Sequence, residues 1–343
     1  MIGKNEKTSP FFGCILILVS CSSINDSKPN IIIILADDAG YSDFGFMGSD
    51  EIKTPNLDQL ALDGIVFNNA YVSASVCSPS RAGLLTGMYQ QRFGHECNLD
   101  SDVNNSFDPN QITIAEALKT EGYTTGLIGK WHLGDKTQNH PLKNGFDYFW
   151  GFISGARYYF YYPNEVNRNS IRNVVENYSQ TKFEGYLTDV LGEKAISFID
   201  KNNQSNNPFF LFLSFNAPHT PMQAKEEVLE KFKDNPRQVY ASMMWSMDEA
   251  IGNVIDALKE NNQYDNTIIY LLSDNGAAMS NNASPFPYKG WKGNQYEGGI
   301  KTPMIMTWKN KIKSNTQFDG FISALDIFKT SLEVSNVNKD LMI

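Results

Sequence analysis

Four oxygen-bearing side chains stand in two adjacent pairs, each just after an apolar, β-branched run of the chain: Asp37 and Asp38, Asp274 and Asn275. Two neighbouring carboxylates repel each other at a buried position unless a cation or a proton resolves the repulsion. Together the pairs offer four hard oxygen ligands, which is the donor set that Ca²⁺ accepts. Zinc is poorly supplied, because the whole sequence holds only four histidines. The local alternatives are a helix cap for the first pair and an Asx turn for the second.

A cysteine lies just ahead of a predicted helix over residues 80–86, in the sequence Cys77-Ser78-Pro79-Ser80-Arg81. A nucleophile at the start of a helix gains from the partial positive charge of the unpaired amides, which also favours a bound anion. Arg81 adds a full positive charge to the same region. The alternative is a buried structural cysteine in a Ser-Pro turn, with Arg81 at the surface.

Two lysines and two histidines in short motifs complete the set of candidate groups: Lys130, His132, His219 and Lys292. Lys130 and His132 follow a predicted strand two residues apart, so an extended backbone would turn both to the same side. His219 is held between prolines, and Lys292 opens a glycine-rich turn. The alternatives are structural histidines and a solvated lysine on a flexible loop.

Strands and helices alternate along the chain. Apolar runs predict strands at 30–36, 124–128, 208–215, 267–272 and 304–308. Helical patterns cover 55–63, 80–86, 113–120, 187–201 and 237–260. This alternation predicts an α/β fold, with a mostly parallel central sheet and helices on both faces. Ligands of such folds bind at the carboxyl ends of the strands, which is where both oxygen-rich pairs fall.

These motifs, in this order, resemble the type I sulfatases of the alkaline phosphatase superfamily over roughly residues 29 to 335. The matching segments are Asp37-Asp38, Cys77–Arg81, Gly129–Gly134, Pro218-His219, Asp274–Gly276 and Lys292–Gly299. The resemblance implies an alkaline phosphatase-like fold and a sulfuric ester hydrolase. It also implies that a maturation enzyme reads Cys-x-Pro-x-Arg and oxidises Cys77 to Cα-formylglycine.

The resemblance further implies a role for each residue. Ca²⁺ would be held by Asp37, Asp38, Asp274, Asn275 and the modified Cys77. Arg81 would steady the modified residue, and Lys130, His219 and Lys292 would hold the sulfate oxygens. His219 or Lys292 would protonate the leaving oxygen. His132 would then deprotonate the second hydroxyl of the hydrated aldehyde, so that the aldehyde re-forms and sulfate leaves.

The first 21 residues are predicted to be a lipoprotein signal peptide. A basic start and a short apolar stretch precede Leu18-Val19-Ser20-Cys21, which resembles a lipobox. Cys21 would carry the lipid, residues 22–29 would be a linker, and 30–343 would be the catalytic domain. We therefore expect an exported, membrane-anchored lipoprotein in the periplasm or at the surface of a Gram-negative bacterium; plain secretion is the alternative. The family's small C-terminal subdomain is expected to be missing or truncated, because the sequence stops at Ile343.

The substrate is predicted to be a sulfated carbohydrate, algal or glycosaminoglycan-like. A formal net charge of −9 argues against a nucleic-acid partner. Ten of the seventeen residues Phe146–Tyr162 are aromatic, and Arg157 lies among them. These rings could stack on sugars while Arg157 pairs with a uronate or a second sulfate, or they could simply pack the core. The alternative functions are a phosphonate or phosphate ester hydrolase of the same superfamily and a truncated, non-catalytic glycan-binding homologue.

Overall fold

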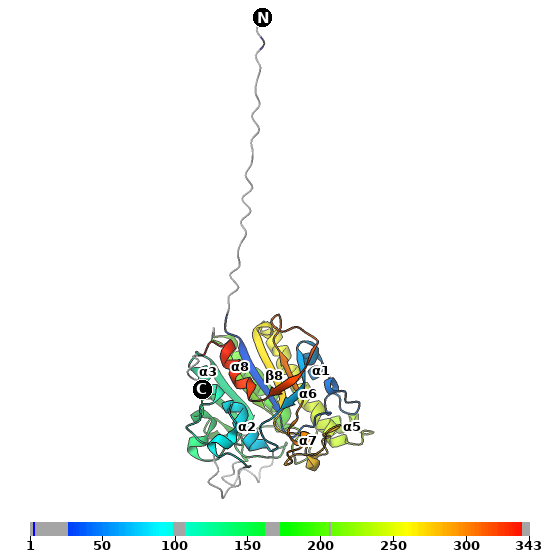
Figure 1. The fold of residues 1–343 in the computed structure, drawn as a ribbon. Helices are drawn as coiled ribbons and strands as arrows, with labels where there is room; N and C mark the ends of the chain where they lie inside the picture. The colour runs from blue at the N-terminus through cyan, green and yellow to red at the C-terminus, as the bar shows by residue number, and fades with distance from the viewer. Residues whose placement is uncertain (1–2, 4–26, 99–106, 162–171, 206, 338–343) are drawn as a thin grey trace.

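A ten-stranded sheet forms the centre of the protein (Figure 1). The computed structural model describes residues 3, 27–98, 107–161, 172–205 and 207–337. Across the sheet the strands are β10 (Thr316–Ser323), β2 (Ile65–Tyr71), β9 (Met304–Thr307), β8 (Thr267–Ser273), β1 (Asn30–Ala36), β7 (Phe209–Ser214), β3 (Thr124–Lys130), β4 (Tyr148–Phe152), β5 (Val175–Glu176) and β6 (Ser179–Gln180). The central strands β8, β1, β7, β3 and β4 all run parallel to their neighbours within that group.

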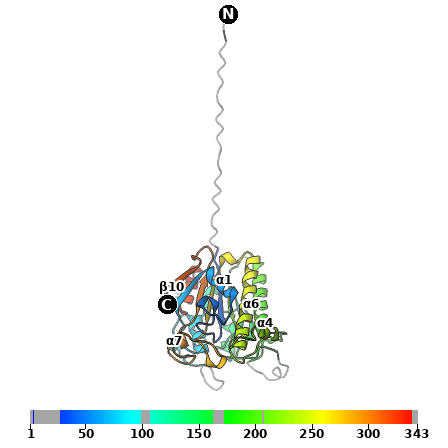
Figure 2. The same cartoon turned by 90° about the vertical axis from the view of Figure 1, so that its right-hand side faces the viewer.

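Helices cover both faces of this sheet. One face carries α1 (Pro55–Leu62), α4 (Leu187–Asn203), α5 (Glu226–Lys231) and α6 (Gln238–Glu260). Figure 2 shows α4 and α6 side by side along it. The other face carries α2 (Cys77–Thr86), α3 (Ile114–Lys119) and α8 (Asp326–Val334). A short helix, α7 (Glu297–Ile300), precedes β9.

The strand β1 shows why the sheet is covered on both sides. All seven of its residues are buried. Ile32 and Ile34 belong to the hydrophobic core under α1, α4 and α6, whereas Ile31, Ile33 and Leu35 belong to the core under α2, α3 and α8. A strand buried on both faces must be apolar throughout, which accounts for the unbroken run of isoleucines in the sequence.

The structure confirms the predicted α/β class and each of the five predicted strands, with ends that shift by no more than two residues. The helix predicted at 80–86 starts earlier, at Cys77. The predictions missed β2, β4, β5, β6 and β10. Only part of β2 is buried, and most of β10 is exposed or half-buried, so neither has the continuous apolar run that marks the central strands. The strand β9 runs antiparallel to β8.

The predicted signal peptide and its lipidation site, Cys21, lie outside the described residues. Within the described ranges, no helix combines the length and the apolar character that crossing a membrane requires.

Candidate active site

The two oxygen-rich pairs meet at the carboxyl ends of β1 and β8. These strands are parallel neighbours, with Ala36 opposite Ser273, so the residues that follow them emerge side by side. The amide of Asp38 donates to Oδ1 of Asp274 at 3.2 Å, and Nδ2 of Asn275 donates to Oδ1 of Asp38 at 2.8 Å. All four side chains of the two pairs are buried. The juxtaposition expected from the sequence is therefore present.

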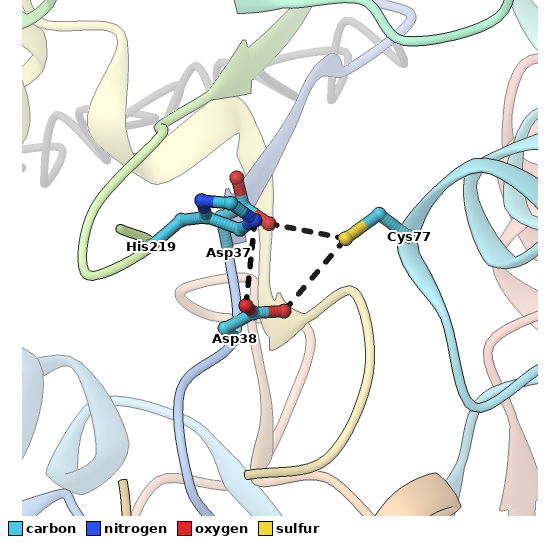
Figure 3. A group of neighbouring side chains, drawn as sticks. All are labelled: Asp37, Asp38, Cys77 and His219. Carbon is cyan, nitrogen blue, oxygen red and sulfur yellow. Dashed lines mark hydrogen bonds and ion pairs between the residues drawn. The ribbon is translucent and has the colours of Figure 1, made fainter. Parts of the chain in front are cut away.

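Asp37 and Asp38 both turn toward Cys77, although neighbouring residues of a strand normally point to opposite faces. The alternation breaks at Asp38, whose φ of 67° lies in the left-handed region. Sγ of Cys77 lies 3.4 Å from Oδ1 of Asp37 and 3.7 Å from Oδ1 of Asp38 (Figure 3). The left-handed turn therefore gathers two carboxylates around one side chain.

Cys77 is the first residue of α2 and is 1% exposed. Burial, together with the negative charge of Asp274, raises the pKa of the Cys77 thiol well above its usual value. The thiol is then neutral at physiological pH, and a neutral thiol is a poor nucleophile. Cys77 in its encoded form is therefore badly suited to attack a substrate, despite its place at a helix N-terminus.

Three cations face the three carboxylates. Nζ of Lys130 lies 2.6 Å from Oδ2 of Asp37, and Nζ of Lys292 lies 2.6 Å from Oδ1 of Asp38 and 3.1 Å from Sγ of Cys77. Arg81 pairs with Oδ2 of Asp274 through Nε at 2.9 Å and Nη2 at 2.8 Å. Buried charges persist only when they are paired in this way. Arg81, Lys130 and Lys292 are thus all gathered at the predicted site.

The pKa values of the carboxylates follow these contacts. Burial is the largest influence on Asp37 and raises the pKa of its carboxyl despite the nearby Lys130 ammonium. Burial also acts upward on Asp274, but the charges of Arg81, Lys130 and Lys292 outweigh it and lower the pKa of Asp274 below its usual value. Asp274 is therefore the carboxylate most firmly held in its charged form.

The site has the donors that a divalent cation needs. Ligand atoms of Asp37, Asp38, Cys77 and His219 all lie within 4.8 Å of one another. Oδ1 of Asn275 is buried and has no hydrogen-bond partner in the structure, which is costly for an amide carbonyl unless another group satisfies it. A hard cation such as Ca²⁺ would satisfy this oxygen and offset the repulsion between the carboxylates. The residues present fit the predicted metal.

His219 enters the site from the loop after β7. Its Nδ1 lies 2.6 Å from the main-chain oxygen of Thr220, and a carbonyl can only accept, so Nδ1 carries a proton. The other nitrogen, Nε2, faces Oδ2 of Asp38 at 3.5 Å. The loop is tied to the end of β1, because Asn281 donates to the main-chain oxygens of both Pro218 and Asp38. His219 therefore presents Nε2 to the carboxylate cluster.

His132 is 8% exposed and lies just beyond the end of β3. Burial, followed by the charges of Lys130 and Arg81, lowers its pKa well below the usual value, so the imidazole is neutral and able to accept a proton. Lys130 and His132 were predicted to point to the same side because an extended backbone was expected between them. The backbone is not extended at His132, so this prediction is wrong in its premise. The φ of His132 is +60°, because the chain turns there through the left-handed region.

Several supporting contacts had no counterpart in the sequence analysis. The hydroxyl of Ser214, the last residue of β7, accepts from Nη1 of Arg81 at 2.6 Å and donates to the main-chain oxygen of Lys130 at 2.7 Å. A polar residue ending a buried apolar strand was the available signal for Ser214. Asn281 lies in a polar loop that carries no comparable signal.

The aromatic segment contributes chiefly to the cores, which is one of its two predicted roles. Phe146, Phe149, Trp150, Phe152 and Tyr159 are all buried core residues. Tyr162 lies outside the described residues.

Arg157 is 4% exposed. Its guanidinium donates to the main-chain oxygens of Tyr158 and Arg172 at 3.0 and 2.8 Å and lies 5.1 Å from the ring centre of Phe183. A contact from Arg157 to substrate would have to replace some of these interactions, and it stays a prediction.

Comparison with known proteins places these observations in a family. The family model described as Sulfatase matches residues 29–337. Human N-acetylgalactosamine-6-sulfatase is 32% identical over 90% of this chain, which spans 62% of that protein's length. The chain thus covers less than two thirds of this curated relative.

Two solved structures of similar proteins have the same fold as this chain. Ps i-CgsB, determined in complex with k-i-k-neocarrahexaose, has a TM-score of 0.88 at 40% identity, covering 92% of this chain and 74% of that one. The PsFucS1 sulfatase from Pseudoalteromonas sp. has a TM-score of 0.79 at 27% identity, covering 91% of this chain and 68% of that one. The predicted alkaline phosphatase-like fold is confirmed.

Proposed function

We propose that this chain, which belongs to the sulfatase family, removes sulfate from a sulfated carbohydrate through a formylglycine at position 77 and a bound Ca²⁺. The main observation behind the proposal is the cluster of three carboxylates and three cations around Cys77. Its members are Asp37, Asp38, Asp274, Arg81, Lys130 and Lys292. Paired with one another, these charges sum to zero, so a divalent cation would leave the site positive. A net positive, largely buried site suits a sulfate ester, which is always anionic.

The modification of Cys77 is supported by its sequence context and by the state of its thiol. The segment Cys77-Ser78-Pro79-Ser80-Arg81 has the signature that maturation enzymes read, and burial keeps the encoded thiol neutral. The hydrate of a formylglycine would supply two hydroxyls, one to attack sulfur and one whose deprotonation lets sulfate leave. We propose that a formylglycine-generating enzyme is therefore a partner of this protein.

Ca²⁺ would be held by Asp37, Asp38, Asp274 and Asn275, together with an oxygen on residue 77. Bound there, it would supply charge stabilisation for the sulfate oxygens and for the attacking hydroxyl. Asn275 supports the assignment most directly, because its Oδ1 is a buried acceptor without a hydrogen-bond partner in the structure.

The remaining steps, which are sulfate binding and proton transfer, are assigned to side chains of this protein. Lys130 and Lys292 are ammonium donors within 4 Å of the carboxylates at residues 37 and 38, and we propose that with the metal in place they hold sulfate oxygens. His219 presents Nε2 to the same cluster, and either His219 or Lys292 would protonate the leaving oxygen. The neutral imidazole of His132 would accept the proton of the second hydroxyl. Arg81 is committed to Asp274, Ser214 and the Lys130 carbonyl, and so would fix the framework around residue 77.

The carbohydrate substrate is supported by the likeness to Ps i-CgsB, whose structure contains a bound oligosaccharide. We propose an algal or glycosaminoglycan-like oligosaccharide rather than a small aryl ester. The test is sulfate release, measured by ion chromatography, from a panel of carrageenan and glycosaminoglycan oligosaccharides, with Cys77→Ala as the control. Release from at least one of them by the wild type alone is expected. Faster turnover of an aryl phosphate than of the paired aryl sulfate would instead favour the phosphate or phosphonate ester alternative.

We further propose that the protein is an exported lipoprotein anchored through Cys21 in the periplasm or at the cell surface of a Gram-negative bacterium. The support is the basic start, the apolar stretch and the lipobox-like Leu18-Val19-Ser20-Cys21 of the sequence.

A further inference from the structure

The side chain of Ser78, the residue after Cys77, is completely buried and makes two hydrogen bonds. Its hydroxyl donates to the main-chain oxygen of His132 at 2.7 Å and lies 2.7 Å from Nε2 of His95. A hydroxyl has one hydrogen to give, and the carbonyl can only accept. The hydroxyl hydrogen of Ser78 therefore goes to the main-chain oxygen of His132, and Nε2 of His95 must be the donor in the contact with Ser78. This assigns a proton to Nε2 of His95.

The carbonyl that Ser78 binds belongs to a residue in an uncommon conformation. A non-glycine residue with φ near +60°, as in His132, costs about 1–3 kcal/mol and persists only where its surroundings hold it. The amide of His132 donates to the oxygen of Ile153 at 3.0 Å, and its carbonyl accepts from Ser78. The ring lies against Gly155, where an added Cβ would come within 2.5 Å of Nε2 of His132. The direction of the imidazole thus depends both on the contacts that hold its backbone and on the packing of the ring against Gly155.

The same segment also holds the first turn of α2. The amide of Ser78 donates to Oδ1 of Asn98 at 3.0 Å, so its amide and its hydroxyl both contact residues of the segment 95–98. His95 is 1% exposed. The helix start that carries Cys77 and the turn that carries His132 are thereby joined through a single hydroxyl.

We propose that His95 is a positioning residue for His132. By donating from Nε2 it orients the Ser78 hydroxyl, which in turn holds the backbone of His132 and fixes the imidazole relative to residue 77. This inference rests on the proposed function for its catalytic consequence, because His132 is assigned there to accept a proton from the hydrated residue 77. The hydrogen-bond chain itself can be tested without any turnover.

The first arm of the test is the ¹⁵N NMR spectrum of the imidazoles in the unmodified protein. The chain has four histidines, so His95→Gln and His140→Ala help to assign the signals. We expect His95 to carry its proton on Nε2. We also expect the ring signals of His132 to move in His95→Ala and in Ser78→Ala. They should stay in place in His95→Gln, whose amide can still donate to Ser78, and in His140→Ala, a matched control outside this chain of contacts.

The second arm measures sulfate ester turnover in the matured enzyme. We expect kcat to fall at least about tenfold in His95→Ala, with KM within about threefold, because a small misplacement of a catalytic group can cost up to a hundredfold. His95→Gln should recover most of that loss. Ser78→Ala provides a second variant with little change in volume, because it removes only a hydroxyl. Ser78 stands at a variable position of the Cys-x-Pro-x-Arg signature, so the substitution leaves that signature intact.

An unmoved His132 signal in both His95→Ala and Ser78→Ala would overturn the inference, as would a proton on Nδ1 alone of His95. A wild-type kcat in His95→Ala would overturn it as well. A wild type that releases no sulfate from any ester would count against the proposed function instead, and the NMR arm would still decide the hydrogen-bond chain.

Discussion

Asn275 donates a hydrogen bond from Nδ2 to Oδ1 of Asp38 at 2.8 Å, across 237 residues of sequence. The bond fixes the carboxamide, because its nitrogen is committed to Asp38 and to the main-chain oxygen of Gly276. The carbonyl oxygen is buried and finds no hydrogen-bond partner among the residues that the structure describes. This relationship is the strongest structural argument that the site is made to hold a cation.

Removing the metal should lower the stability of the protein. A ligand that binds only the folded state adds about 2.7 kcal/mol when its concentration is one hundred times Kd. We therefore expect Ca²⁺ to raise the Tm of chelator-treated protein, and this increase to be much smaller in Asn275→Ala and in Asp274→Ala. Asn253→Ala, at an exposed position on α6, is the matched control. If neither Tm nor activity changes when chelator or Ca²⁺ is added, the metal assignment is wrong.

Asp248 should make stability depend on pH between about 4 and 6. Burial is the main cause that raises its pKa from 3.8 to about 6, although the carboxylate accepts from the amides of Asn56 and Leu57 at the start of α1. Because the folded pKa is the higher one, the stabilising contribution is complete below pH 3.8 and is lost as the pH rises through 6.

The measurement for Asp248 is urea unfolding at several pH values. The difference in the free energy of unfolding between wild type and Asp248→Asn should shift with pH inside this window, by up to about 3 kcal/mol, and should be flat above it. Parallel curves for the two proteins across the window would count against the assigned pKa.

Lipid should be attached to the protein at Cys21. We expect metabolic labelling with a fatty-acid analogue to mark the wild type and to be lost in Cys21→Ala, while Cys97→Ala, at an exposed cysteine, keeps the label. Wild-type protein that is exported but unlabelled would indicate plain secretion.

Arg157→Ala separates the two interpretations of the aromatic segment. Arg157 donates to two main-chain oxygens, so a fall in Tm is expected under either interpretation. The substrate-contact prediction further expects turnover of a sulfated oligosaccharide to fall while the rate on an aryl sulfate is retained. Equal losses on both substrates would assign Arg157 to structure alone.

Much of the site could be predicted because its residues follow apolar runs or belong to short motifs that can be recognised in the sequence. Asp37 and Asp274 follow continuous apolar runs, and a parallel sheet brings such strand ends together. Cys77 and Arg81 are marked by their spacing around Pro79. Ser214 and His95 were not identified, because their roles come from contacts between segments that only the folded chain brings together.

Local backbone geometry was the other part that could not be predicted. Asp and His adopt the left-handed conformation more often than most other non-glycine residues, but residue type alone does not single out Asp38 and His132. In the folded chain that conformation gathers the two carboxylates and turns the imidazole. Likewise, β10 lies at the edge of the sheet with an exposed surface, so it lacks the apolar pattern that identified β1.

Cys77→Ala should abolish sulfate release while leaving the fold intact. The side chain is needed for covalent chemistry, and its loss removes one small buried group that lies among charged partners rather than within a hydrophobic core cluster. We expect a Tm close to that of the wild type and no turnover above background. Cys77→Ser should be nearly inactive as well, unless the expression host oxidises serine. Turnover by the alanine variant at the wild-type rate would rule out residue 77 as the nucleophile.

The most direct test of the central claim is peptide mass spectrometry across residue 77 of protein made with a formylglycine-generating enzyme, with sulfate release measured on the same samples. We expect Cys77 to be converted to formylglycine and activity to rise in proportion to the converted fraction. Full activity in samples whose Cys77 is entirely unmodified would contradict that claim.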